Sequence, residues 1–431
     1  QSLNQLAYDL ISINNVDYKG ELREYYLSFF PSFGEIKLGK QIHAWGAVDA
    51  SSPIDILNPI NYYYLFTDAD ETKIGRESLV IDLFFDAIKI ELIAMPNHAP
   101  NYIPIEDPEF PIILPVAIKK YQFLDWKNPI EYGGYIKTSL NNIDLSAYYF
   151  SGYDRNFNLY ATNIFANSAD VVTVADTVFS YRKTDMYALS NVSFIGDLTI
   201  RADFAYFKTD AGDLPVSNRP YFGKDILADY TSFPTYITTI PFNISAEYYQ
   251  YNLQIESELL FDIDCSAQLF GHQDIKIKGD SIIVSTTNLD INLDSRDFFY
   301  PGMGSSMATL AKNGLLFNFK KSFLDDTIEL QLISLIDTKD KGQLNQFKAT
   351  FNIIDNLSLS FLYYKGKGNR IKYPDITFID NDGDGINDDF INNNTGRDMP
   401  GLNGDGIVDA NMINESLLYP FNAMEDFSHI R

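Results

Sequence analysis

Apolar and polar residues alternate with period two over much of the chain, and the alternation restarts after two-residue turns. After the turn at Gly196-Asp197, one phase is apolar: Leu198, Ile200, Ala202, Phe204 and Tyr206. The opposite phase is polar: Thr199, Arg201 and Asp203. A second run of this kind follows Asn141-Asn142. Because a pleated strand sends successive side chains to opposite faces, the pattern predicts strands with one apolar and one polar face.

The same unit recurs as a series of predicted hairpins. The strand pairs are Glu21–Phe30 with Glu35–Trp45, Leu79–Phe85 with Ile88–Ala94, Tyr132–Leu140 with Ile143–Phe150, Leu159–Ala166 with Val171–Tyr181, Met186–Ile195 with Leu198–Lys208, Tyr249–Phe261 with Ser266–Lys276, Leu315–Phe323 with Thr327–Ile336, and Gln346–Ile354 with Leu357–Tyr364. The fourth pair has the weakest pattern. These hairpins give about 16 strands, and Leu6–Ile13 with a closing strand would give about 18, the size that leaves an aqueous channel.

Short and long connections alternate along this series. The tight joints are 31–34, 86–87, 141–142, 196–197, 324–326 and 355–356, and the long connections are 46–76, 96–130, 210–241, 279–311 and 367–431. Outer-membrane barrels show this asymmetry, with short periplasmic turns and long extracellular loops. We therefore predict an all-β fold, a transmembrane antiparallel β-barrel of about 16–18 strands over residues 1–366. Residues 367–431 would be an acidic extracellular region. No terminal aromatic strand is visible after it, so the barrel would be closed either by a strand that is missing here or in a different way.

Composition narrows the class further. The net charge of −25 argues against nucleic-acid binding, because phosphate contacts need clustered Lys and Arg. It is compatible with surface solubility, with divalent-cation binding, or with a lumen that prefers cations. The sequence contains no run of 18 apolar residues, so it predicts no transmembrane helix. The single Cys265 cannot form an internal disulfide. A chain that begins at Gln1 is what a cleaved secretory signal or a trimmed sequence would leave.

One short stretch resembles bacterial outer-membrane porin-like barrels of the alginate-export-like type. In that family a G(R/K)Q…WG strand end precedes an …NP loop. The matching positions here are Gly39, Lys40, Gln41, Trp45, Gly46, Asn58 and Pro59. The resemblance covers about 25 residues closely and implies a porin-like barrel in the outer membrane of a bacterial cell. Trp45-Gly46 can equally be an interfacial aromatic residue followed by a glycine that releases the chain into a loop.

The strongest local motif predicts a calcium loop. Asp380 to Asp388 fits D-x-D-x-D-G, in which carboxylates at alternate positions converge on one cation and Gly permits the sharp turn. The predicted ligands are Asp380, Asp382, Asp384, Ile386 (backbone) and Asp388, with a second, partial loop at Asn403, Asp405, Ile407 and Asp409. Ile391 replaces the usual Glu at position 12, so Asp389 or another loop must complete the shell. An acidic surface loop without an ion is the alternative.

Polar residues in the inward phase of the strands are the candidate pore lining. They are Lys37, Gln41, His43, Lys89, Glu91, Asp144, Arg201, Asp203, Gln250, Asn252, Gln254, Glu256, Glu258, Glu329, Gln331, Lys348 and Asn352. The alternative for each of them is that the side chain only hydrates the interior of a wide barrel and contacts no specific solute. The sequence contains no H-E-x-x-H, G-x-S-x-G or phosphate-binding glycine loop, so we expect no enzyme.

Three functions fit these patterns. The first is an outer-membrane porin-like channel for passive diffusion of small polar or cationic solutes, with Ca²⁺-stabilised surface loops and selectivity from pore radius and lining charge. It would contact outer-membrane lipid and lipopolysaccharide, and could form a homo-oligomer or bind a surface protein. The second is a non-conducting scaffold barrel that anchors a partner or appendage; a lumen plugged by 96–130 or 279–311 would favour it. The third is a secreted calcium-binding all-β adhesin.

Overall fold

The computed structural model describes most of the chain. It covers residues 22–49, 51–62, 72–103, 123, 129–166, 172–210, 235–285, 290–307, 311–338, 342–354, 357–367, 376–379, 389–392, 397–398, 407–409 and 427–430. The predicted strand at Leu6–Ile13 lies outside these residues. No helix in the described ranges is long and apolar enough to cross a membrane.

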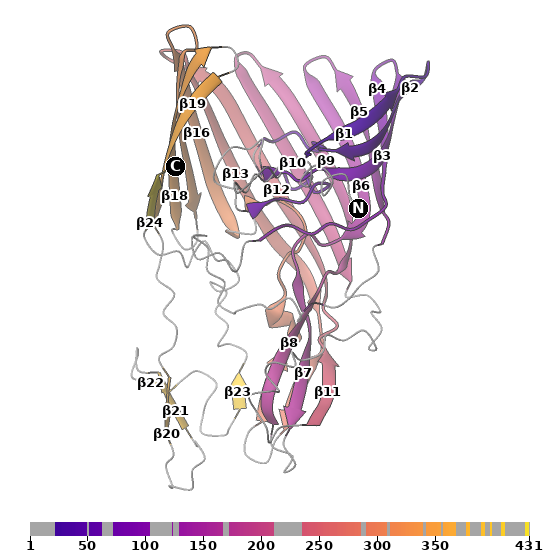
Figure 1. The fold of residues 1–431 in the computed structure, drawn as a ribbon, viewed down its shortest axis with the longest axis vertical. Helices are drawn as coiled ribbons and strands as arrows, with labels where there is room; N and C mark the ends of the chain where they lie inside the picture. The colour runs from indigo at the N-terminus through magenta and orange to yellow at the C-terminus, as the bar shows by residue number, and fades with distance from the viewer. Residues whose placement is uncertain are drawn as a thin grey trace, which may run out of the picture.

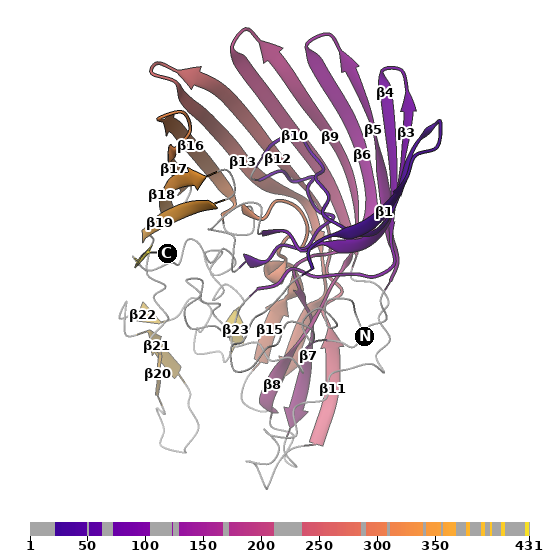
Figure 2. The same cartoon turned by 45° about the horizontal axis from the view of Figure 1, so that its top comes forward.

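Fifteen strands form one continuous antiparallel sheet that curves around a central space (Figures 1 and 2). In spatial order they are β1 (Tyr25–Phe29), β2 (Gly34–Gln41), β3 (Arg76–Phe85), β4 (Ile88–Met95), β5 (Glu131–Leu140), β6 (Ile143–Tyr153), β9 (Lys183–Ile195), β10 (Leu198–Asp210), β12 (Ser245–Leu259), β13 (Ile263–Lys278), β16 (Asn313–Phe323), β17 (Ile328–Asp337), β18 (Gln343–Ile354), β19 (Leu357–Lys367) and β24 (Phe427–Ile430). The predicted all-β, antiparallel barrel architecture is confirmed. In the described residues the wall is open, with β1 and β24 as its edges.

The fourth predicted hairpin exists but does not belong to this wall. β7 (Asn158–Ala166) and β8 (Val172–Ser180) pair with β11 (Thr235–Pro241) in a separate sheet. The wall passes directly from β6 to β9, which pair over eleven residues from Ile143↔Ser193 to Tyr153↔Lys183. That continuous pairing leaves no edge for the hairpin, so the wall has fewer strands than a count of hairpins gives.

Short strands gather at the same end of the molecule as β7, β8 and β11, below the wall in Figure 1. They form two further sheets: β14 (Ser281–Ser285), β15 (Asp290–Asp294) and β23 (Ile407–Asp409), and β20 (Ile376–Ile379), β21 (Asp389–Asn392) and β22 (Arg397–Asp398). A 3₁₀ turn, η4 (Ser295–Phe298), follows β15. We call this the loop end of the molecule and the opposite end the turn end.

Backbone geometry explains the turn end. Asp86, Asn141 and Gly196 have φ angles of 45°, 52° and 60°. Two-residue hairpins need such left-handed positions, which Gly, Asn and Asp tolerate best. The short turns at 31–34, 86–87, 141–142, 196–197 and 324–326 lie at one end of the sheet, which is the top in Figure 1.

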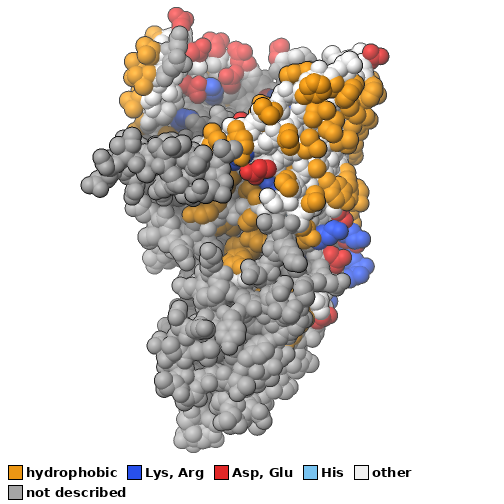
Figure 3. Space-filling view, turned by 45° about the vertical axis from the view of Figure 1, so that its right-hand side comes forward, with side chains coloured by type: hydrophobic (Ala, Val, Ile, Leu, Met, Phe, Trp, Pro, Cys, Tyr) orange, Lys and Arg blue, Asp and Glu red, His pale blue; other side chains and the backbone are white. Residues whose placement is uncertain are grey.

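The outer face of the wall is an apolar belt bounded by tyrosines. On β10, Leu198 and Phe204 are exposed, and the belt ends at Tyr206 before the exposed, charged Lys208. Leu198 to Tyr206 is about 26 Å along a strand, near the roughly 25 Å height of the apolar band of outer-membrane barrels. Figure 3 shows apolar side chains over the upper outer face with charged side chains below them. This is the surface of a membrane-spanning wall.

A cross-strand ladder marks the loop-end border of the belt. Tyr149, Tyr187, Tyr206 and Tyr249 are successive register partners on β6, β9, β10 and β12. The ring centroids are 5.2 Å apart for Tyr149 and Tyr187, and 6.4 Å apart for Tyr187 and Tyr206. Amphipathic rings in one row across adjacent strands are typical of the membrane–water interface.

Candidate channel lumen

A segment of the first long connection folds into the curve of the wall. We call residues 45–49 and 51–58 the inward segment; it lies in the concave side of the sheet in Figures 1 and 2. The sequence predicts an extracellular loop from residue 46 onward, but this part runs inside the barrel. Its polar groups contact β10, β12 and β13, and its apolar side chains are buried.

Asp203 of β10 is the main attachment point for the inward segment. Its carboxylate accepts hydrogen bonds from the backbone N–H groups of Ala47 and Val48, each at 3.0 Å, and from the Ser52 hydroxyl at 2.6 Å. The neighbouring Arg201 donates to the Ala47 carbonyl at 3.1 Å. One predicted lumen carboxylate thus satisfies three donors of an otherwise irregular backbone.

Three amide side chains extend the attachment across β12 and β13. Gln254 accepts from the Asp49 N–H at 3.0 Å, and Gln268 accepts from the Ser51 hydroxyl at 3.1 Å. Asn252 donates to the Ser51 carbonyl at 3.1 Å. The predicted inward orientation of Asn252 and Gln254 therefore agrees with their place in the structure, but they contact protein instead of open water.

A second stretch also enters the lumen, from the 279–311 connection. Tyr248 and Gln250 of β12 donate to the carbonyl of Met303 at 3.0 and 3.2 Å, and Gln250 accepts from the N–H of Ser305 at 2.9 Å. An apolar cluster fills the space between the two stretches and the wall. It includes Ile54, Ile56, Leu57, Met186, Phe207, Tyr248, Phe299 and Met303. The half of the lumen beside β3 to β12 is packed like a protein core.

A buried ionic cluster holds the far end of the inward segment. Glu131, at the start of β5, pairs with Arg76 at 2.6 Å and with Arg155 at 2.9 Å. Arg76 donates to the Leu57 carbonyl at 3.2 Å, and Arg155 donates to the Ile56 carbonyl at 2.8 Å. The arginines thus link the wall carboxylate to the segment. Sequence analysis missed this cluster, because its members are isolated charges far apart along the chain.

His98 completes the cluster. Its Nδ1 lies 2.9 Å from Glu131 Oε1 and 3.2 Å from Arg155 Nη1. The pKa of His98 is lowered to about 4, chiefly by burial and also by the charges of Arg155 and Arg76, against the opposing effect of Glu131. The imidazole is therefore neutral at physiological pH.

The other half of the lumen keeps a cavity of 870 Å³. It lies between the inward segment and β13, β16, β17 and β18, and it is bordered by residues of both. Its charged lining is balanced, with Arg23, Lys73 and Lys348 against Glu24, Asp49 and Asp55. The Lys73–Asp55 pair is 2.5 Å long. Three of the predicted lining residues not yet placed, His43, Gln331 and Lys348, border this cavity.

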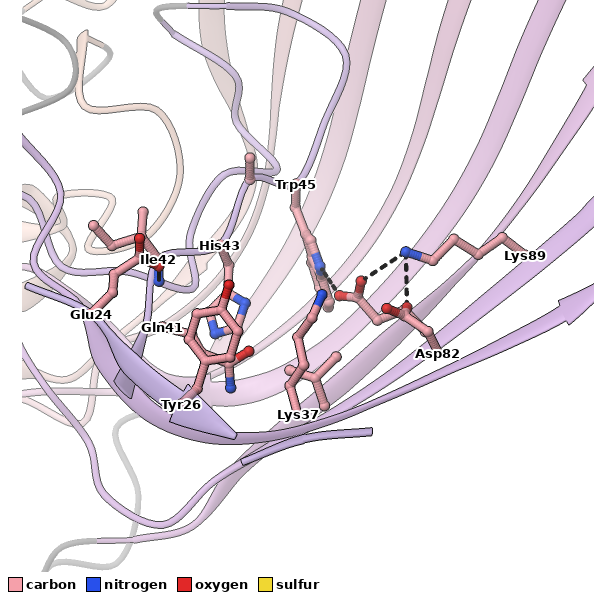
Figure 4. Close-up of a pocket in the computed structure, with 12 residues that line it drawn as sticks. Glu24, Tyr26, Lys37, Gln41, Ile42, His43, Trp45, Asp82 and Lys89 are labelled. Atoms are coloured by element: carbon pink, nitrogen blue, oxygen red, sulfur yellow. Dashed lines mark hydrogen bonds and ion pairs between the residues drawn. The ribbon is translucent and has the colours of Figure 1, made fainter. Parts of the chain in front are cut away.

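A smaller cavity of 190 Å³ lies against β2, β3 and β4 (Figure 4). It brings together five predicted lining residues, Lys37, Gln41, His43, Lys89 and Glu91. Glu91 accepts from the indole of Trp45 at 2.8 Å, so the tryptophan points inward at the start of the inward segment. Trp45 is thus a lumen residue and does not lie at the membrane–water interface.

The remaining predicted residues are distributed along the wall. Glu256 pairs with Arg201 at 2.7 Å, Glu329 pairs with Lys320 at 2.8 Å, and Glu258 is exposed next to the β12–β13 turn. The calcium-loop residues Asp380, Asp382, Asp384, Ile386, Asp388, Asn403 and Asp405 lie outside the described residues. Ile407 and Asp409 begin and end β23. The described residues contain no group of three His, Cys, Asp or Glu side chains placed to hold a metal ion.

Fold and lumen together define a membrane-spanning antiparallel β-barrel whose interior is partly occupied by its own chain. No family model matches the sequence, and no curated protein matches it. Among solved structures, it is similar to a porin at 9% identity, over 79% of each chain, with a TM-score of 0.31. OccK8 (OprE) of Pseudomonas aeruginosa is 10% identical over 78% of this chain and 82% of its own, with a TM-score of 0.24. OccAB3 of Acinetobacter baumannii is 10% identical over 77% and 85%, with a TM-score of 0.23.

Proposed function

We propose that this protein is a bacterial outer-membrane, porin-like channel for passive diffusion of small polar solutes. One observation carries the proposal: a wall that is apolar outside and polar inside keeps an 870 Å³ cavity beside the segment that narrows it. A pore of this kind selects by radius and by the groups that line it, without any chemical step. The exposed apolar belt counts against a secreted adhesin, which would have to cover that surface.

The inward segment would set the radius of this channel. Its backbone is fixed to Asp203 and Gln254 on the wall and to the arginines of the ionic cluster at the loop end. Because the charges around the cavity balance, a preference for cations has no support from the cavity itself. It would have to come from the acidic remainder of the chain.

The test is single-channel conductance of the detergent-purified protein in a planar bilayer, with and without Ca²⁺. Stable steps are expected. A barrel that inserts, shown by its resistance to SDS without heating, but stays silent would overturn the channel.

A specific observation favours a second candidate, a non-conducting scaffold barrel. The apolar cluster and the Met303–Ser305 stretch fill one half of the lumen, as a plug would. The sheets at the loop end would then be the surface that binds a partner. Conductance separates this candidate from the channel, because a scaffold needs no open path.

The proposal includes Ca²⁺ at Asp380–Asp388 and at the second loop. Its support is the D-x-D-x-D-G pattern alone. In an extracellular region the ion would stiffen loops, and we propose no catalytic role for it.

A further inference from the structure

The wall of the larger cavity changes polarity along its strands. Nearest the loop end, Leu316, Leu335 and Leu344 are register partners on β16, β17 and β18. All three are buried and line the cavity. Ile60, from the first long connection, and Met307, from the 279–311 connection, pack against the apolar cluster that contains these leucines. This leucine row gives the cavity an aliphatic surface, and contact with it would not favour the binding of water-soluble sugars or ions.

The next rows toward the turn end are increasingly polar. Asn318, Ile333 and Gln346 are register partners one step from the leucine row. Lys320, Gln331 and Lys348 form the row after that. Gln331 donates to Asn318 at 2.9 Å. Side-chain amides both donate and accept hydrogen bonds, so these rows suit hydroxyl or amide groups of a ligand.

We infer that this cavity binds uncharged amphiphiles, molecules with a hydroxyl- or amide-bearing head and a short aliphatic segment. The aliphatic segment lies on the leucine row and the head reaches Asn318, Gln331 and Gln346. An uncharged head follows from the balance of three cationic and three anionic lining residues. A mostly apolar pocket with a few convergent polar groups is the usual form of a small-molecule site. Whether such a ligand is also a transported solute rests on the proposed function.

The test measures binding apart from conduction. Hexyl β-glucoside and glucose are titrated into the full chain in lipid nanodiscs by calorimetry, with empty nanodiscs subtracted. Hexyl glucoside is expected to bind and glucose to bind at least tenfold more weakly. Leu335→Asn should raise the Kd for hexyl glucoside on the order of tenfold, because the hexyl group of the ligand loses its apolar contact with this side chain. Leu362→Asn is the matched control, since Leu362 is also buried and inward-facing but does not border the cavity.

A second variant keeps the inference falsifiable if Leu335→Asn does not fold. Ile333 is half-buried and borders the cavity, and Ile333→Asn should also weaken binding of hexyl glucoside. Equal binding of hexyl glucoside and glucose, or unchanged binding of hexyl glucoside in the folded variant, overturns the inference. A silent barrel that still prefers hexyl glucoside overturns only the channel, and a conducting barrel with no preference overturns only the amphiphile site.

Discussion

The Ser52 hydroxyl donates a 2.6 Å hydrogen bond to Asp203, joining the first long connection to a wall strand 151 residues later in the chain. Asp203 also accepts from two backbone N–H groups of the inward segment. Each hydrogen bond to a charged acceptor contributes about 1.5–3 kcal/mol. This carboxylate is therefore expected to be the largest single polar contribution to holding the segment against the wall.

Asp203→Ala should free the inward segment and raise single-channel conductance. The three donors lose their shared acceptor, so the segment would spend part of its time away from the wall and widen the path. Asp144→Ala is the control, because Asp144 is an inward-facing carboxylate next to the β5–β6 turn that pairs with Lys137 at 3.1 Å. Conductance equal to wild type in a folded Asp203→Ala protein would show that the segment does not limit the pore.

Glu131→Gln should destabilise the folded barrel by about 3–5 kcal/mol, since it leaves two buried arginine charges without their carboxylate. The measurement is the temperature at which the compact, SDS-resistant form is lost on a gel. Glu77→Gln, an exposed position beside Arg76 on β3, should shift that temperature little. A similar shift for both variants would mean that the cluster is not a stabilising centre.

His98 should make the protein less stable in mild acid. The pKa of His98 is about 4 in the folded chain and about 6.5 when unfolded, so the unfolded state binds more protons between these values. Its stability contribution is complete above pH 6.5 and falls as the pH drops toward 4, by up to roughly 3 kcal/mol. Unfolding rates measured from pH 7 to 4 should rise less steeply in His98→Gln. Parallel profiles for the two proteins would contradict this.

A charge placed in the apolar belt should impair insertion according to depth. Ala202 faces outward on β10 between Leu198 and Tyr206, and Arg there should cost about 2–4 kcal/mol near the bilayer centre. Asp210→Arg lies on the same face of the same strand beyond the tyrosine border, where the cost should be about 0–1 kcal/mol. Folding into lipid vesicles from urea measures both. Equal costs would place the membrane elsewhere.

Asp382→Asn should weaken Ca²⁺ binding at the predicted loop by removing one of its converging carboxylates. Terbium luminescence on the detergent-solubilised protein reads the site directly. Asp375→Asn changes the charge of the same region by the same amount without touching the motif. Loss of signal in both variants would indicate general charge attraction and no specific site.

The wall could be predicted from the sequence, because the alternation of residues within a strand sets which side chains lie on each of its faces. The alternation from Leu198 to Tyr206 gave the lipid face of β10, and Asn141 and Gly196 gave the turns. The fourth hairpin shows the limit of this reasoning. Local pattern predicts that β7 and β8 pair, but whether they join the wall depends on β6 pairing with β9.

The lumen could be predicted only in part, because its contents depend on distant contacts. The inward orientation of Asp203 and Gln254 followed from strand phase. Their contacts with Ala47, Val48, Asp49 and Ser52 could not be predicted, since that stretch has no periodic pattern and its partners lie far along the chain. The pairing of Glu131 with Arg76 and Arg155 is likewise a property of the folded space and not of local spacing.

The span of these contacts also bears on the order of assembly. The hairpins of the wall close over a few residues, whereas the Ser51 hydroxyl must meet Gln268, 217 residues away. Closing long loops costs entropy before any contact repays it, so such contacts form late. The barrel wall would thus assemble first, with a wide and wet interior, and the chain would narrow its own passage in a final step after β10 to β13 are in place.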